Sequence, residues 1–246
     1  MPEVKIAEAT MEEVMAVRKR RNFTVISMIY MISIFISAGT ILTGCRNGEE
    51  NKTEKVIFKI KDYEVGQEQF EYYLAENRSN IISQFQEEQE NIDDAFWKKV
   101  TEDGRTVSEK LEEAAKDQCT YEYTLLLLAK EKGLADSASF QDIKKDMEKE
   151  NQRRSDAVER GEVIYGNKEY SMSTYMSYYL SNLTRELIRV MEENELKYTD
   201  EQLEQYCIEQ GLAAQEGKTL GETYGLAYKT YLLEQYIRQK MGTGYF

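Results

Sequence analysis

Histidine is absent from this sequence, and proline occurs only once, as Pro2. The chain therefore lacks the commonest general base and the commonest metal ligand, which excludes catalytic sites of the Ser-His-Asp and Cys-His kinds. Cysteine occurs three times, at Cys45, Cys119 and Cys207. The two that follow Cys45 cannot build a zinc site alone, and no Walker, GxGxxG or EF-hand pattern is present. We expect a protein that is not an enzyme and that holds no metal ion or cofactor.

Long hydrophobic runs are also lacking, except for one near the N-terminus. Residues 23–42 carry no charge, follow the basic residues 18–21, and precede the small residues Thr43 and Gly44. A basic segment, an apolar segment and small residues, in that order, have the layout of an export signal. An uncleaved membrane anchor is the alternative, because about 20 apolar residues also span a bilayer. In both cases we expect the basic residues to stay inside and the rest of the chain to face outward.

The apolar run ends in Leu42-Thr43-Gly44-Cys45, which resembles the lipobox of bacterial lipoproteins. The resemblance implies that residues 1–44 are a lipoprotein signal peptide, cleaved before Cys45. It also implies that the Cys45 sulfur carries a diacylglyceryl group. Two acyl chains suffice for stable anchoring, at about 0.8 kcal/mol per buried methylene. We therefore expect a lipid-anchored protein on the extracytoplasmic face of the cell membrane.

Acidic residues outnumber basic residues after residue 44. Residues 1–44 contain five basic and four acidic side chains of the 32 and 45 in the whole chain, so 27 and 41 remain, a net charge of −14. Such a surface repels phosphate backbones and anionic headgroups. We expect no nucleic-acid partner, and contact with the membrane through the lipid on Cys45.

A flexible linker and a hairpin are predicted next. Residues 45–54 are polar and lack an apolar period, as is typical of a linker. In residues 56–60 apolar and polar side chains alternate, Lys61-Asp62 suits a turn, and Tyr63 with Val65 suits a return strand. Residues 55–246 are then predicted to form one helical domain.

After this hairpin the apolar residues recur at intervals of three or four positions, which is the period of a helix face. Helices are predicted over 67–85 and 107–129, from Ser137 or Ser139 through Met147, from Ser171 or Ser173 through Met191, and over 203–208 and 226–241. An exposed arm is predicted at 144–154 and a break at 161–171. The run Leu125-Leu126-Leu127-Leu128 predicts a buried central helix. Thr199 and Gln202 have the spacing of a capping box, whereas Gly217 and Gly221 are predicted to interrupt the chain. The fold class is mainly α, an irregular helical bundle with a short N-terminal β-hairpin.

Cys119 and Cys207 lie in helical, partly apolar segments. Buried free thiols are one interpretation. A disulfide between helices is the other, because the expected compartment is oxidising.

Several segments together resemble the N-terminal chaperone domain of the SurA and PrsA foldases. They are VIFKIKDYEVGQEQFEYYL, AFWKKVTEDGRTVSEKLEEAAKDQ, LLLLAKEKGL, and IYGNKEYSMSTYMSYYLSNL followed by YTDEQLEQYC. The resemblance covers about residues 55–210, and residues 211–246 would pack back as a C-terminal helix. It implies a helical cradle that binds unfolded exported polypeptides. In complete foldases a parvulin-type prolyl isomerase domain follows; here the expected continuation lacks histidine and glycine-rich strands, so we expect no isomerase activity.

Aromatic side chains at helical spacing are candidates for contact with such clients. They are Phe70, Tyr73, Phe96, Trp97, Tyr170, Tyr175, Tyr178 and Tyr179. Core packing is the alternative for each of them. An accessory scaffold lipoprotein that binds one folded partner is the second functional hypothesis. A solute-binding lipoprotein is disfavoured, because it needs alternating strands and helices in two lobes. The sequence leaves open whether the protein forms a homodimer.

Overall fold

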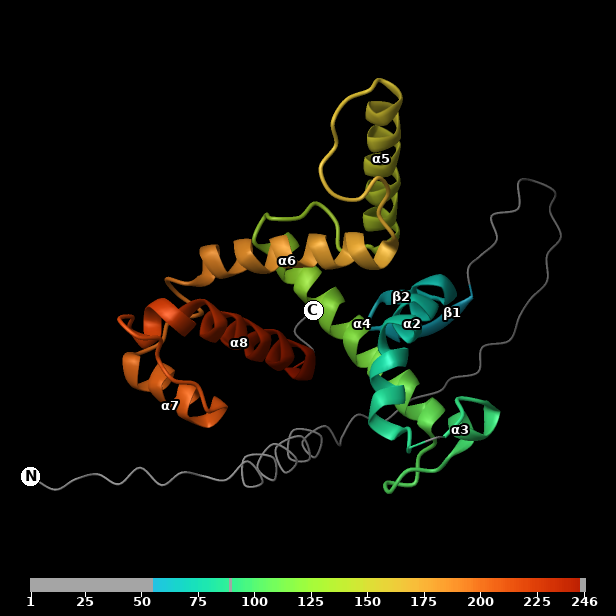
Figure 1. The fold of residues 1–246 in the computed structure, drawn as a ribbon, viewed down its shortest axis with the longest axis horizontal. Coiled ribbons are helices and arrows are strands. Elements are labelled where there is room, and N and C mark those ends of the chain that lie inside the picture. Colours follow the sequence, from blue (N-terminus) through green and yellow to red (C-terminus); the bar gives the residue numbers. More distant parts are fainter. Residues whose placement is uncertain (1–54, 89, 244–246) are drawn as a thin grey trace, which may run out of the picture. The chain divides into compact units, whose positions relative to one another are not determined.

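The computed structural model describes residues 55–88 and 90–243, which are mainly helical, with a two-stranded antiparallel hairpin at the start of the described chain (Figure 1). The elements are β1 Val56–Ile60, β2 Tyr63–Gly66, α2 Gln67–Phe85, α3 Asp94–Lys98, α4 Val107–Glu131, α5 Phe140–Glu159, α6 Met172–Met191, α7 Asp200–Gln210 and α8 Leu220–Thr243. The mainly α class with a short hairpin is confirmed. The predicted signal peptide, Cys45 and the linker through residue 54 lie outside the described residues.

The hairpin opens the described chain and packs on α2 and α4. Ile60 lies opposite Tyr63, so the turn has two residues. Lys61 at its first position has a φ of 52°, which suits the twist of a tight hairpin. Val65 is fully buried in a cluster with Phe70. The short sheet is thus stabilised by the helices beneath it.

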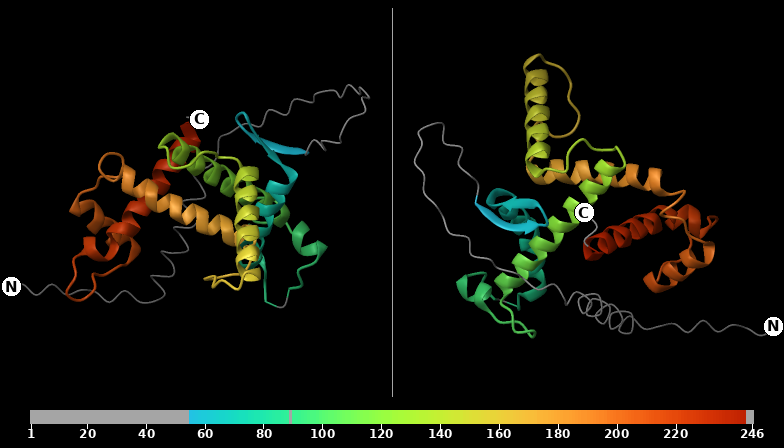
Figure 2. Two further views of the ribbon diagram at one scale, coloured as in Figure 1. Left: turned by 90° about the horizontal axis from the view of Figure 1, so that it is seen from above. Right: turned by 180° about the vertical axis from the view of Figure 1, so that it is seen from behind.

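α4 is the central helix of the described chain. It packs against α2, α3, α6 and α8. The right-hand view of Figure 2 shows α6 crossing α4 near the C-terminal end of α4. Leu125, Leu126 and Leu128 on α4 are each at most 3% exposed. Its first turn carries a capping box between Thr106 and Glu109. The prediction of a buried central helix is confirmed.

α5 is a largely polar helix whose base joins the main core. Phe140 and Ile143 in its first turn are buried with residues of α4 and α6. Ser139 is its N-cap but makes no capping hydrogen bond with its side chain. The outer part, predicted as an exposed arm, is exposed at most positions. Arg154 and Ala157 are the buried exceptions, with 8% and 2% exposure.

Arg154 ties the outer part of α5 to the loop that precedes α6. Its guanidinium donates to the carbonyl oxygens of Tyr165 and Asn167 at 3.0 and 2.7 Å, and to the Tyr170 hydroxyl at 2.7 Å. Asn151 on α5 adds two hydrogen bonds to the Tyr170 backbone, at 2.8 and 2.9 Å. This loop includes the predicted break at 161–171, and polar contacts rather than apolar burial hold it.

α7 begins at the predicted capping box. The Thr199 side chain accepts a hydrogen bond from the Gln202 N–H, and the Gln202 side chain accepts one from the Thr199 N–H. The helix ends at Gly211, whose φ of 65° is left-handed, as is usual after a helix C-terminus.

α8 starts at Leu220, six residues before the predicted start. Gly221 therefore lies inside the helix, and the prediction that it interrupts the chain was wrong. Thr219 and Glu222 form another capping box: the Thr219 hydroxyl accepts from the Glu222 N–H at 3.2 Å, and the Glu222 carboxylate accepts from the Thr219 N–H at 2.8 Å. Two satisfied backbone donors offset a glycine penalty of about 1 kcal/mol.

Cys119 and Cys207 are both buried and free. Cys119 accepts a hydrogen bond from the Gln69 amide at 3.5 Å, and burial raises the pKa of its thiol to about 12. Cys207 packs with Leu203 and Tyr228 in a different cluster. The interpretation as buried thiols is confirmed, and the two cysteines form no disulfide.

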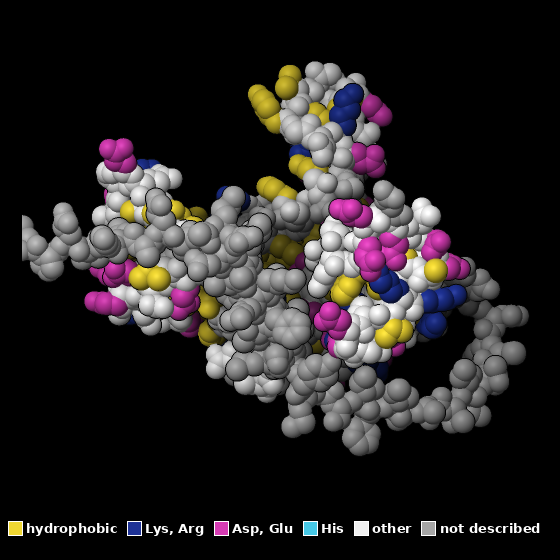
Figure 3. All heavy atoms as spheres, turned by 60° about the horizontal axis from the view of Figure 1, so that its bottom comes forward, with side chains coloured by type: hydrophobic (Ala, Val, Ile, Leu, Met, Phe, Trp, Pro, Cys, Tyr) yellow, Lys and Arg dark blue, Asp and Glu magenta, His cyan; other side chains and the backbone are white. Residues whose placement is uncertain are grey.

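Figure 3 shows acidic and basic side chains on the described surface, with hydrophobic side chains between them, several of which lie close together at the top of the view. Among the residues that the structure describes, no helix is both long enough and apolar enough to cross a membrane.

Candidate functional site

A groove of about 740 Å³ lies between α2, α4, α6 and α8. We call it the central groove. Its lining residues are Tyr72 and Glu76 from α2; Gln118, Tyr121, Glu122 and Leu125 from α4; Ser173, Met176, Ser177, Leu180, Ser181, Thr184 and Arg185 from α6; and Thr230 from α8. Leu125 and Met176 are buried, so an apolar base lies beneath polar walls. This size falls in the usual range of ligand-binding clefts.

The wall formed by α2 and α4 contains a buried carboxyl group. Glu122 accepts hydrogen bonds from the Tyr73 hydroxyl at 2.9 Å and from the Gln118 amide at 2.8 Å. Gln118 in turn accepts one from Asn77 at 2.7 Å. Burial raises the pKa of Glu122; these two hydrogen bonds oppose the rise, and nearby Glu76 adds to it. Within the described ranges Glu122 has no ion pair, so a cation placed in the groove would stabilise its charged form.

The wall formed by α6 carries a row of hydroxyl groups. Ser173, Ser177 and Ser181 recur every four residues and Thr184 follows. Ser173 donates to Glu76 on α2 at 3.1 Å. In the part of the chain that the structure describes, the Ser177 and Ser181 hydroxyls bond to no other group. A hydroxyl both donates and accepts, so these side chains can pair with either backbone group of a bound chain.

The spacing of this row matches an extended polypeptide. Four residues of an α-helix rise about 6 Å. Two residues of an extended chain span about 6.6 Å, and every second residue faces the same way. Successive hydroxyl groups on α6 can therefore meet successive equivalent backbone groups of an extended segment.

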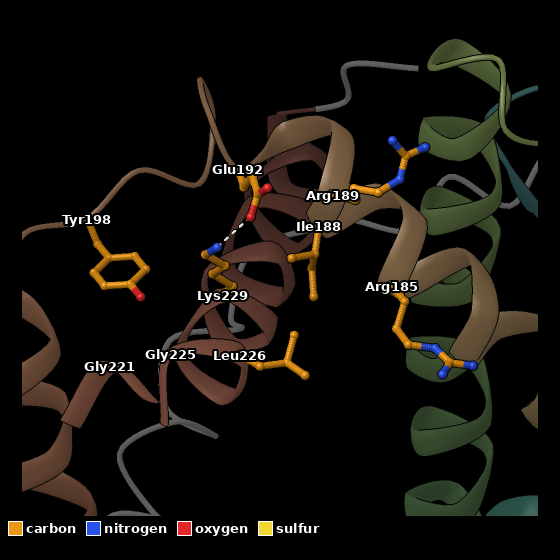
Figure 4. Close-up of a pocket in the computed structure, with 9 residues that line it drawn as sticks. All are labelled: Arg185, Ile188, Arg189, Glu192, Tyr198, Gly221, Gly225, Leu226 and Lys229. Atoms are coloured by element: carbon orange, nitrogen blue, oxygen red, sulfur yellow. Dashed lines mark hydrogen bonds and ion pairs between the residues drawn. The ribbon is translucent and has the colours of Figure 1, made fainter. Parts of the chain in front are cut away.

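A second hollow of about 390 Å³ lies between α6 and α8 (Figure 4). It is lined by Arg185, Ile188, Arg189 and Glu192 of α6, by Tyr198, and by Gly221, Gly225, Leu226 and Lys229 of α8. Lys229 pairs with Glu192 at 2.5 Å. Gly225 accommodates the Tyr198 hydroxyl, which would lie 3.0 Å from an added Cβ. Arg185 borders both hollows, so the central groove and this hollow meet at its side chain.

Three of the eight predicted aromatic contact residues belong to the core. Phe70 and Tyr73 are buried under the hairpin, and Phe96 is 1% exposed among residues of α2 and α4. Tyr73 reaches the groove only through its hydrogen bond to Glu122. Trp97 is half-buried, with the Arg78 guanidinium 4.5 Å from its ring centroid.

The four predicted tyrosines near the start of α6 lie apart from those residues. Tyr170, Tyr175 and Tyr179 are half-buried, and each ring contacts the next, at centroid distances of 5.9 and 6.4 Å. Tyr178 is 59% exposed. The eight side chains thus occupy three places on the protein and do not line one surface.

The groove residues were not among the predicted contacts. A signal for part of them exists in the sequence, because Ser173, Ser177 and Ser181 form a stripe with helical period. The wall formed by α2 and α4 gives no such signal, since Glu76 and Glu122 come together only through the packing of α2 on α4.

The sequence matches no protein-family model, no curated protein and no solved structure. Over residues 55–88 and 90–243, no three or more Cys, Asp or Glu side chains are grouped so as to hold a metal ion.

Proposed function

We propose that this protein is a membrane-anchored, extracytoplasmic lipoprotein that holds unfolded segments of exported polypeptides in the central groove, without prolyl isomerase activity. It takes no cofactor, and its partners are clients that are not yet folded. In this proposal the domain shares its fold and its holding role with the N-terminal domain of the SurA and PrsA foldases.

The observation that carries the proposal is the central groove. An unfolded chain presents backbone N–H and C=O groups that need partners when they leave water. The exposed hydroxyls of Ser177 and Ser181 supply partners that do not depend on the client's sequence. The half-buried Tyr72, Tyr121 and Leu180 supply apolar contact. Such a surface suits many clients better than one.

The leader supports the location. The layout of residues 1–45 favours export and lipidation at Cys45, and a tethered binder there would meet chains as they emerge from the membrane. The absence of histidine favours binding over catalysis.

The test uses the full chain in lipid nanodiscs and a urea-denatured client diluted into buffer. We expect the protein to suppress aggregation of the client and to leave the rate of prolyl isomerisation in a test peptide unchanged. Ser177→Trp fills the groove from the α6 wall and should remove most of the suppression. Ser83→Trp is the matched control, because Ser83 is also an exposed helical serine but lies on α2 outside the groove.

Circular dichroism checks that both variants keep the helical fold. Equal suppression of aggregation by the two variants would show that the client does not bind in the groove. No suppression by the unchanged protein at a several-fold excess would contradict the proposed function itself.

An accessory scaffold that binds one folded partner is the second candidate. The observation that favours it is an exposed apolar group at the outer end of α5, where Val163 and Tyr165 are 80% and 87% exposed. A folded partner would bind this fixed surface rather than the groove. Tyr165→Asp would then abolish recovery of one stoichiometric partner from solubilised membranes, while Ser177→Trp would not.

A further inference from the structure

We propose that the central groove selects extended segments that carry a basic side chain and an acidic group about five residues apart. The inference rests on the proposed function, because it specifies which segments the groove holds. It concerns charged groups at the two ends of the groove, rather than the net negative charge of the chain.

The first end of the groove is acidic. Glu76 and Glu122 both line it, from α2 and α4. The hydrogen bond from Ser173 places Glu76 beside the first turn of α6. Among the described residues, Arg185 is the only basic side chain that lines the groove, and it lies toward the other end of α6. At this end, a lysine or arginine of a bound segment would therefore meet two carboxyl groups and no basic side chain of the groove lining.

The second end carries Arg185. Its guanidinium donates to the Asn182 side chain, and within the described ranges it forms no ion pair. The neighbouring cations differ, because Arg189 pairs with Glu186 at 2.8 Å and Lys229 pairs with Glu192. Arg185 is thus the basic group of this region whose charge is not already neutralised. A carboxylate suits it, because a guanidinium can bind both oxygens at once.

The length of α6 between these ends sets the spacing. Ser173 and Arg185 are twelve residues apart, which corresponds to about 18 Å along a helix. An extended chain covers that distance in about five residues, at roughly 3.3 Å each. A segment that satisfies both ends therefore has its two charges about five residues apart, and an adjacent pair of charges can satisfy only one end.

Three fluorescent peptides, of which the first two share one composition, test this with the full chain in nanodiscs. The first has Lys and Asp five residues apart and an amidated C-terminus. The second has them adjacent, and the third has Lys five residues before a free C-terminal carboxylate and no Asp. We expect the first peptide to bind about fivefold more tightly than the second, as one additional surface ion pair provides. Tight binding of the third would show that a chain terminus serves as well as an acidic side chain; its weak binding would restrict the preference to side chains.

Arg185→Gln should abolish the difference between the first two peptides, whereas Arg189→Gln should retain it, because Arg189 borders only the second hollow. If the first two peptides bind equally well to the unchanged protein, and Ser177→Trp weakens both, the charge preference is wrong and the proposed function stands. If none of the peptides binds, both fail.

Discussion

α4 and α5 are helices of 25 and 20 residues that are held in different ways. α4 buries a largely apolar face against four other helices. The outer part of α5 is held by one buried arginine that binds loop carbonyl oxygens and a tyrosine hydroxyl. Apolar burial resists unfolding of the whole domain, whereas a polar network maintains a local shape. The difference separates the framework of the groove from an arm that can change locally.

The largest effect is expected at the centre of α4. Leu128 is 1% exposed, and Leu128→Ala should lower the free energy of unfolding by about 2–5 kcal/mol through lost burial and a cavity. Leu226→Ala is the matched control: Leu226 is 63% exposed on α8, and its loss should cost less than about 0.5 kcal/mol. Urea unfolding followed by circular dichroism measures both. Similar losses of unfolding free energy in the two variants would mean that burial on α4 does not stabilise the domain as the structure indicates.

The polar support of α5 gives the next effect. Arg154→Ala should cost about 2 kcal/mol, as expected when hydrogen bonds from a charged group are lost. Hydrogen exchange should speed up in residues 161–171 and stay slow in α4. Arg153 is the control, because its side chain is 62% exposed in a surface pair with Glu150, so Arg153→Ala should change little. Faster exchange throughout α4 in Arg154→Ala would contradict a local role.

Glu122 makes the framework sensitive to pH. Burial raises the pKa of its carboxyl in the folded state, so the folded protein binds more protons than the unfolded chain in that range. Stability is then greatest below the unfolded pKa and falls as pH rises through the folded one. Glu122→Gln should remove this fall, which amounts to about 1.4 kcal/mol per unit of pKa elevation.

Unfolding at pH 4 to 8 compares Glu122→Gln with the unchanged protein and with Glu88→Gln, at an exposed surface position. The Glu122 variant should gain stability relative to both as pH rises. Parallel curves for all three would contradict a raised pKa of Glu122 in the folded state.

The smallest effect concerns the helix starts. The Thr106 hydroxyl accepts from the Glu109 N–H at 3.2 Å, and Thr106→Ala should cost about 1 kcal/mol. Ser139→Ala should cost clearly less, because Ser139 caps α5 without a side-chain hydrogen bond. A larger loss at Ser139 would show that the two helix starts do not differ as the structure indicates.

Local signals in the sequence predicted most of the elements. The hairpin, the start of α2 after Gly66 and the capping box at Thr199 follow from alternation, period and capping chemistry, and the structure confirms them. The start of α8 was missed because Gly221 weakens a helix by propensity. The Thr219-Glu222 capping box carried the contrary signal.

Apart from the serine stripe on α6, the groove was beyond such signals. A helical period identifies which face of α6 is apolar, but it does not say which helices meet that face. Phe70 and Phe96 therefore ranked with Tyr178 as possible contacts, although two are core residues and one is exposed. Glu122 is separated from Tyr73 by 49 positions in the sequence, so only tertiary packing forms that wall.

The most direct test of the central claim is disulfide crosslinking between the groove and a bound segment. Ser177→Cys and Ser83→Cys each add one exposed thiol, whereas Cys119 and Cys207 stay buried. An extended peptide with an activated disulfide is the probe. The account predicts fast crosslinking at position 177 that an excess of unlabelled unfolded client suppresses, and slow crosslinking at position 83 that the client leaves unchanged. Equal rates at the two positions, insensitive to the client, would contradict it.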